Sequence, residues 1–388
     1  MLVWMTLTHL PTIASIFVNQ PFGFVSAAEG FILLSALFTG RIYFRLAERE
    51  GYQAMRRKVW MRTLRLYAYH ASLLAFAFVV VAYIAAPGGK PGLYNLLDFY
   101  FAAGARRAFL DGALLIYRPP LLDILPMYII FLLFTPLALI LARRIGWNYI
   151  LGASFALWFA AQFGLRQAAY NLMAHAFGLR IPLNEIGSFD LFAWQFLWAI
   201  GLWLGVRWAS GDLPAKAWAR RFTIPAAVIF PILLALRYAV GRGIELGMFE
   251  VSFDKWHLGV VRLVDFAAIA ALLIRYRPVL RPLSIRPLVM MGQASIQVFC
   301  AHLLFCFLGL AIMGNAPMVS GWNQLLLVDA TLAALVLTAW IFRKSEAKIE
   351  SGSLASTRRQ LAPQHLSLKT KPVDGTEIPP RDPAPEHH

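Results

Sequence analysis

Long apolar segments recur along most of the chain, and short polar or basic stretches separate them. A helix needs about 20 mostly apolar residues to cross the hydrocarbon layer of a membrane. Segments of this kind predict spans at approximately residues 2–18, 22–44, 64–86, 121–142, 147–164, 190–209, 222–240, 258–275, 288–312 and 322–343. The pattern therefore predicts an all-α, polytopic integral membrane protein with about ten transmembrane helices.

The composition excludes a soluble protein of two or three domains. Hydrophobic residues make up 59% of the 388 residues and charged residues make up 14%, whereas a soluble protein has roughly 25% charged residues. After the last apolar segment the chain becomes rich in proline, serine and charge, which is typical of disorder. We therefore expect a membrane domain over residues 1–343 and a disordered cytoplasmic tail over residues 344–388.

The net charge of +16 comes mainly from basic residues in every second loop between the predicted spans. Cytoplasmic loops carry such an excess of lysine and arginine, so these loops and both termini are predicted to be cytoplasmic. An anionic cytoplasmic ligand would also suit this charge, and the two interpretations are compatible. Binding to nucleic acid is not expected, because the basic residues lie between apolar segments.

Two ionisable residues, His9 and Glu29, lie within the first two predicted spans, where such groups are costly and usually functional. If the chain turns at the outer face around residues 19–21, helical rise places both residues ~14 Å below that face. A carboxylate beside an imidazole fixes its tautomer and raises its basicity, which a general base for an alcohol requires. Catalysis by His9 with support from Glu29 is one hypothesis, and a structural hydrogen bond between two helices is the other.

Basic residues are dense where the second predicted span ends and the third begins. This density suits the phosphates of a coenzyme A donor, which arginine side chains bind with paired hydrogen bonds. Anchoring to lipid phosphates is the alternative. The residues predicted to bind the donor are Arg41, Arg45, Arg57, Arg62 and Arg65.

Polar and aromatic residues open the fourth and sixth predicted spans at their outer ends. Such groups suit the hydroxyls of a sugar acceptor, with Trp194 as a stacking face, or they are helix caps and interface anchors. The residues predicted to bind the acceptor are Asp123, Tyr128, Asp190, Trp194 and Gln195.

Three further residues are candidates for substrate binding. Lys255 and Arg262, near Asp254, form either an ion-pair network or a site for an acid. His302 lies midway along the ninth predicted span and is either an interhelical hydrogen-bond partner or a substrate-binding residue. Candidate metal ligands are not clustered at a recognised spacing, so no metal site is predicted.

Five segments carry a resemblance to a known family: Pro21–Tyr43, Asp123–Pro136, Asp190–Trp198, Asp254–Leu263 and Met291–Phe305. Together they resemble the OpgC family, whose members are inner-membrane proteins that succinylate osmoregulated periplasmic glucans. This family is related to the acyltransferase-3 membrane family. The resemblance spreads over about residues 1–340 and omits the tail.

The resemblance implies direct O-acyl transfer at a bacterial inner membrane. The donor would be a cytoplasmic acyl-CoA, in this family succinyl-CoA, used as a co-substrate with no permanently bound cofactor, and the acceptor would be a periplasmic glucan. His9 matches the family's catalytic histidine, and Glu29 matches its acidic position. The acyltransferase-3 pattern also places an arginine eleven positions before that histidine, a position that here falls ahead of Met1.

Two other functions stay open from the sequence. In a proton-coupled transporter or flippase, histidine and carboxylate groups near the midplane relay protons, but no inverted repeat is visible here. A non-catalytic membrane scaffold would leave the ionisable groups within the spans without a purpose. Membrane lipid is an expected partner in all three cases, and the sequence sets no oligomeric state.

Overall fold

The computed structural model describes residues 1–86, 91–280, 282, 284–313 and 321–361. Over these ranges every secondary-structure element is a helix, apart from an isolated bridge between Phe22 and Val25. The all-α prediction is therefore confirmed. The internal contacts divide the chain into two units, Met1–Arg343 and Lys344–His388, and all residues of the site described below belong to the first.

Helices fill each of the predicted apolar segments, and shorter helices connect them. The helices that overlap these segments are α1 (Leu2–His9), α2 (Ile13–Val18), α3 (Ala27–Phe76), the π-helix η1 (Ala77–Val81), α4 (Ala82–Ala85), α8 (Ile124–Ile145), α9 (Trp147–Ala161), α11 (Leu191–Ala209), α12 (Ala215–Val240), α14 (Val260–Arg275), α15 (Arg286–Gln293), α16 (Ser295–Met313) and α17 (Gly321–Leu361). The connections contain α5 (Pro91–Leu96), α6 (Asp98–Ala103), α7 (Ala105–Ala113), α10 (Leu165–Phe177), η2 (Leu183–Ile186), η3 (Gly247–Phe249) and α13 (Glu250–Phe253).

Six helical segments of the described chain have the length and hydropathy to cross a membrane. They are Ala27–Ala85, Ile124–Ile145, Leu183–Ala209, Ala215–Val240, Ser295–Met313 and Gly321–Lys344. The chain is accordingly a membrane protein, but the predicted number of ten spans is not confirmed. The second and third predicted spans lie together in Ala27–Ala85, and the helices in the first, fifth and eighth predicted segments are too short to cross the hydrocarbon layer.

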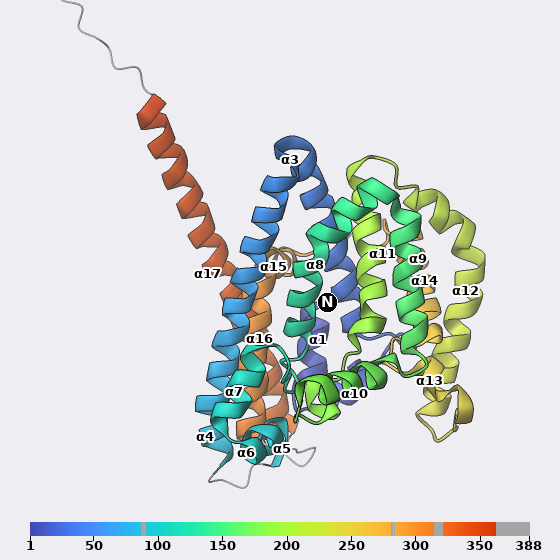
Figure 1. Cartoon of the computed structure of the whole chain (residues 1–388), viewed down its shortest axis with the longest axis vertical. Coiled ribbons are helices and arrows are strands. Elements are labelled where there is room, and N and C mark those ends of the chain that lie inside the picture. Colours follow the sequence, from blue (N-terminus) through green and yellow to red (C-terminus); the bar gives the residue numbers. More distant parts are fainter. Residues whose placement is uncertain (87–90, 281, 283, 314–320, 362–388) are drawn as a thin grey trace, which may run out of the picture. The chain divides into compact units, whose positions relative to one another are not determined.

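Gly51 divides the longest helix, α3, into two arms. Its φ of 85° lies in the left-handed region that glycine adopts readily, so the helical path breaks there. Figure 1 shows the chain reversing direction at this point, and it shows the α8–α9 and α11–α12 connections at the same end of the unit. Helices α5, α6, α7, α10 and α13 lie at the opposite end. Three of the loops predicted to be basic and cytoplasmic are thus gathered at one end.

The first apolar segment is not the continuous helix that hydropathy predicts over residues 2–18. α1 ends at His9, just before Pro11, which has no backbone N–H and cannot continue a helix. The chain then folds back, since the indole Nε1 of Trp4 donates to the carbonyl oxygen of Val18 at 2.5 Å. The reversal therefore occurs at residues 10–12 and not at the predicted turn around residues 19–21.

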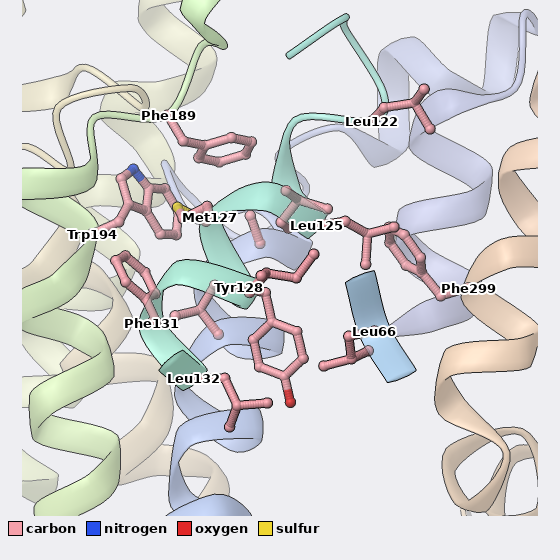
Figure 2. Packing of buried hydrophobic residues seen from close by; sticks show 14 of the residues in the cluster. Leu66, Leu122, Leu125, Met127, Tyr128, Phe131, Leu132, Phe189, Trp194 and Phe299 are labelled. Carbon is pink, nitrogen blue, oxygen red and sulfur yellow. The ribbon is translucent and has the colours of Figure 1, made fainter. Parts of the chain in front are cut away.

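Small residues allow α3 and α11 to pack with their backbones in close contact. A Cβ added at Gly40 would overlap the backbone of Leu202, and one at Gly205 would overlap the backbone of Leu37. Such close approach is typical of helix pairs in membranes. α8 packs against both helices, and its buried residues, including Tyr128, lie within the hydrophobic core that Figure 2 shows.

The last helix, α17, includes residues 344–361, which the sequence assigns to a disordered tail. This part of the chain is helical in the structure. The division of the internal contacts after Arg343 coincides with the predicted domain boundary. The rest of the predicted tail, residues 362–388, lies outside the described residues.

Candidate active site

A pair of histidines joins the first helix to the ninth apolar segment. His9 ends α1, and His302 lies within α16, which packs against α1. Nδ1 of His9 lies 3.2 Å from Nε2 of His302, and the two rings are stacked with their centroids 5.5 Å apart. His302 is fully buried, whereas His9 is half-buried.

The hydrogen-bond partners decide which nitrogen of each neutral ring carries the proton. Nδ1 of His302 lies 2.8 Å from the carbonyl oxygen of Phe299, which only accepts hydrogen bonds. Nδ1 of His302 is therefore the donor, and its Nε2 is left as an acceptor. Nδ1 of His9 then donates to that Nε2, so the free lone pair of His9 lies on its own Nε2. In the described part of the chain, His302 is the one residue that hydrogen-bonds to the His9 ring.

Glu29 is not the partner of His9, and that part of the prediction is wrong. Oε2 of Glu29 accepts from the backbone N–H of Ser26 at 3.0 Å and from its hydroxyl at 2.7 Å. Oε1 accepts from Nε of Arg262 at 2.9 Å and also from Nη2. At most 1% of either side chain in this ion pair is exposed. Both oxygens of the carboxylate are thus occupied.

The predicted match in depth fails because the chain reverses before α3 begins. Gly30, which follows Glu29, lies so close to Met1 that a Cβ would overlap the Met1 side chain. Met1 is at the opposite end of α1 from His9, about 12 Å away at the helical rise of 1.5 Å per residue. A signal for the true role of Glu29 is present in the sequence. Ser26, three positions earlier, completes the capping box that starts α3.

A second carboxylate fixes the segment between α2 and α3. Oδ2 of Asp265, in α14, accepts from the backbone N–H of Phe24 at 2.7 Å. Gly23 has a φ of 84° and lies against the same carboxylate, where a Cβ would overlap it. Asp265 and Arg262, both on α14, thus hold the loop and the start of α3.

A cavity of about 1010 Å³ lies among α1, α3, α8, α15 and α16. Most of its lining is apolar, and Leu66 and Leu125 of the core in Figure 2 form part of its wall. Phe299 also lines the cavity and packs edge-on against the ring of His302, with centroids 4.9 Å apart. Phe299 therefore borders both the cavity and His302, and neither His9 nor His302 is among the residues that line the cavity.

Two of the five arginines predicted to bind the donor, Arg62 and Arg65, line this cavity. Nη2 of Arg62 donates to the hydroxyl of Tyr128 at 2.7 Å. This partner is neutral, so it satisfies a hydrogen bond without compensating the guanidinium charge. Cations within a membrane domain usually mark a path for an ion or an anionic substrate.

The other three predicted arginines do not line the cavity. Arg41 stacks on Trp208, with its guanidinium carbon 3.6 Å from the ring centroid. Arg45 and Arg57 are exposed on the two arms of α3, near the turn at Gly51. The structure therefore brings together only part of the predicted basic cluster.

The residues predicted to bind the acceptor mostly hold loops in place. Asp190 caps α11 by accepting from the N–H of Phe192 at 2.8 Å, and Trp194 donates from Nε1 to the carbonyl oxygen of Trp256 at 3.1 Å. Trp194 is fully buried, so the prediction that its ring stacks on a sugar is wrong. Oδ2 of Asp190 is buried and has no hydrogen-bond partner among the described residues.

The remaining members of this set lie in two places. Oδ2 of the buried Asp123 accepts from the N–H of Ser188 at 3.2 Å. Gln195 is bound to Ser154 of α9, with its Oε1 2.6 Å from the serine hydroxyl. Tyr128 lies instead at the cavity, where Arg62 donates to it. The structure therefore places Tyr128 on the side predicted to bind the donor.

Lys255 lies in the segment between α13 and α14. Its Nζ is 4.7 Å from the ring centroid of Trp256 and 5.9 Å from that of Phe189. Burial lowers the pKa of its ammonium group. It interacts electrostatically with residues from four parts of the chain: His9, Glu29, Asp123 and Arg262.

A second pair that involves a histidine lies beside Lys255 and nearer to solvent. Nδ1 of His257 lies 2.5 Å from Oδ2 of Asp254, which also accepts from the backbone N–H of His257. This hydrogen bond raises the pKa of His257 despite its partial burial, and the charge of Asp190 adds to the effect. The pair lies between α13 and α14, outside the membrane-spanning helices.

The link between His9 and His302 could not be found from the sequence, because these residues are 293 positions apart. Hydropathy and spacing describe one helix at a time and do not say which faces of two helices meet. Phe299 has no polar side chain to mark it, and its contribution comes from its backbone carbonyl oxygen and its ring.

One family model, described as OpgC protein, matches residues 1–347. The match includes both histidines, the Glu29–Arg262 pair and every residue that lines the cavity. No curated protein and no solved structure matches this chain.

Proposed function

The chain belongs to the OpgC family, and from this premise we propose that it is a membrane O-acyltransferase. It moves an acyl group, succinyl in our proposal, from a cytoplasmic acyl-CoA to a hydroxyl of a periplasmic glucan at the bacterial inner membrane. The observation that carries the proposal is the order of hydrogen bonds from Phe299 through His302 to His9. This order leaves Nε2 of His9 with a free lone pair at a half-buried position.

The cavity fits the thioester arm of a coenzyme A donor. Its walls are mostly apolar and suit a flexible pantetheine chain, while Arg62 and Arg65 supply positive charge for phosphates. Phe299 is shared by the cavity and the histidine pair, so an arm that fills the cavity would end beside His302. The acceptor would approach from the other end of the unit, where Asp190, Lys255 and Trp256 lie.

The reaction follows from general base catalysis. Nε2 of His9 removes the proton from a sugar hydroxyl as the hydroxyl oxygen attacks the thioester carbonyl carbon. The tetrahedral intermediate collapses, the C–S bond breaks, and the sulfur leaves as the thiolate of coenzyme A. His9 then returns its proton to the sulfur, so the products are an ester and free coenzyme A. His302 holds the imidazole in the reactive tautomer and stabilises its protonated form by accepting from Nδ1.

The test replaces His9 by alanine in the full chain. A strain that lacks the gene is complemented with each form, and the acyl content of its periplasmic glucans is measured by mass spectrometry. We expect His9→Ala to lower acylation by about 100-fold or more, the range for loss of a general base, with unchanged protein in the membrane. His175→Ala, which alters an exposed histidine of α10, is the matched control and should acylate like the wild type.

Two results would contradict the proposal in different ways. Near-normal acylation by the His9→Ala form would remove His9 from the chemistry. Unacylated glucans in the wild type, together with proton-coupled flux of a substrate, would instead favour a transporter or flippase.

A further inference from the structure

One face of the first arm of α3 changes from apolar to basic toward the turn at Gly51. Residues spaced by four, three and four positions share a face of a helix. The residues with this spacing, which we call the α3 stripe, are Leu34, Phe38, Arg41 and Arg45. Leu34 and Phe38 are 42% and 47% exposed, and Arg45 is exposed as well. The stripe is therefore a surface of the protein and not part of its core.

The α3 stripe is about as long as one leaflet of a membrane is thick. From Leu34 to Arg45 the helix rises ~16 Å at 1.5 Å per residue, and half of the hydrocarbon layer measures about 15 Å. This arm of α3 belongs to Ala27–Ala85, a segment that can cross a membrane. With the apolar residues beside the acyl chains, the two arginines reach the level of the lipid headgroups.

Trp208, near the end of α11, holds Arg41 in a defined position. The guanidinium carbon lies 3.6 Å from the ring centroid, the shortest arginine–ring distance in the described part of the chain. Stacking occupies a face of the guanidinium and leaves the N–H groups at its edge free to donate. Among the described residues, no carboxylate forms a salt bridge with Arg41 or Arg45. Both positive charges are thus available to an anion from outside the chain.

The apolar half of the α3 stripe also borders the large cavity. Leu34 and Phe38 line the cavity although both are exposed, so the cavity opens along this face. The ring of Phe38 lies 6.0 Å from that of Trp208, between centroids. Arg41 and Arg45 do not line the cavity, whose positive charge comes from other arginines. A ligand on the stripe would therefore cover the open side of the cavity.

We infer that the α3 stripe binds one anionic phospholipid from the leaflet at the Gly51 end of the unit. The lipid phosphate accepts hydrogen bonds from Arg41 and Arg45, and one acyl chain lies along Phe38 and Leu34 and closes the side of the cavity. Charge complementarity identifies this occupant, because two uncompensated guanidinium groups at the end of an apolar surface match an anionic head on a hydrocarbon chain. The inference goes beyond the proposed function and does not depend on acyl transfer.

The test compares two lipids with the same acyl chains, dioleoylphosphatidylglycerol and the zwitterionic dioleoylphosphatidylcholine. Full-length protein in a neutral detergent is titrated with each lipid, and native mass spectrometry gives the Kd of the first lipid bound. The wild type should prefer phosphatidylglycerol. The double variant Arg41→Gln, Arg45→Gln should lower this preference by about 30-fold, or about fivefold for each arginine. Arg41→Lys, Arg45→Lys keeps both charges and should keep most of the preference.

The matched control is the double variant Arg220→Gln, Arg221→Gln, which removes the same charge from two exposed arginines of α12. It should retain the wild-type preference. An unchanged preference in Arg41→Gln, Arg45→Gln would overturn the inference, and so would an equal loss in the control, which would mean that the lipid responds to net charge alone.

A second measurement separates a lipid phosphate from the phosphates of coenzyme A. Equilibrium binding of coenzyme A is measured in nanodiscs of dioleoylphosphatidylcholine, where no anionic lipid is present. Arg41→Gln, Arg45→Gln should bind coenzyme A with the affinity of the wild type. A loss of coenzyme A binding, with the preference for phosphatidylglycerol retained, would overturn the inference and assign both arginines to the donor. Neither measurement involves acyl transfer, so a failure of the proposed function would leave these results unchanged.

Discussion

Two polar pairs connect the N-terminal segment to distant helices, and they differ in which hydrogen-bonding atoms each leaves free. The Glu29–Arg262 pair is almost fully buried and uses both carboxylate oxygens. The His9–His302 pair is oriented by one carbonyl oxygen and leaves a lone pair on His9. A saturated pair has no capacity for another proton or ligand, whereas an unsaturated pair keeps one atom for chemistry. We therefore propose a structural role for the first pair and a reactive role for the second.

The largest expected effect tests the structural side of this comparison. Glu29→Ala leaves the guanidinium of Arg262 buried without a carboxylate and removes the capping box of α3. We expect a loss of about 3–5 kcal/mol in the free energy of unfolding, measured by thermal unfolding in detergent and by the amount of protein in the membrane. Glu48→Ala, at an exposed position on the same helix, should change stability by less than about 1 kcal/mol.

Replacing both members of the ionic pair is a second test of its structural role. A Glu29→Met, Arg262→Met double variant removes both charges, so it should recover much of the stability that Glu29→Ala loses. A Glu29→Ala protein with normal stability and no acyl transfer would break the comparison, since Glu29 would then act in the reaction.

The fold was largely predictable, because hydropathy identifies apolar segments and each segment contains helix. Hydropathy does not give direction, however, and the first segment turns back at Pro11 although it is apolar throughout. The predicted depth of Glu29 depended on a straight first helix and failed for that reason. The capping box formed by Ser26 and Glu29 was a readable local signal, and it explains why that carboxylate is buried.

The candidate site was only partly predictable, because its contacts join residues far apart in the sequence. His9, His302, Lys255 and Arg262 could each be selected as ionisable groups in apolar surroundings. Their partners depend on helix rotation and on which helices are neighbours, which the composition of one segment does not contain. Trp194 illustrates the limit: its position near a helix start suggested an exposed ring, but its indole is buried against Phe189.

A smaller effect is expected from the second histidine of the reactive pair. His302→Leu removes the acceptor for Nδ1 of His9, so the reactive tautomer is no longer held. We expect kcat to fall by about 10- to 100-fold, the range for loss of a residue that orients a reactive group, with little change in KM for the donor. His302→Gln should restore part of kcat, because its Oε1 can accept in place of Nε2. A fall in KM and kcat together, without rescue by glutamine, would indicate a packing role instead.

The smallest effect concerns the pair nearest to solvent, Asp254 and His257. The hydrogen bond to Asp254 raises the folded-state pKa of His257 above the ordinary value of 6.5. The stabilisation of the folded protein by protonated His257 is therefore complete below about pH 6.5, and it is lost as the pH rises through the folded-state pKa. The same contacts lower the pKa of Asp254, although burial opposes this. The stabilisation by ionised Asp254 is therefore lost only as the pH falls through its folded-state pKa. The His257 side chain is 39% exposed, and solvent screens the interaction.

Loss of the His257 proton should lower the Tm of the wild type between pH 5.5 and pH 8.5. We expect His257→Asn to make this decrease in Tm smaller by only about 1–2 °C, as for a screened surface pair. The charged groups that face His257 are Asp254, Asp190 and Arg166. His175→Asn, at an exposed histidine hydrogen-bonded to a carbonyl oxygen, is the matched control and should leave the pH dependence unchanged. An identical pH dependence in wild type and His257→Asn would contradict the assignment. A change much larger than this would mean that an exposed pair contributes as much as a buried one, which would undo the distinction drawn from Glu29 and His9.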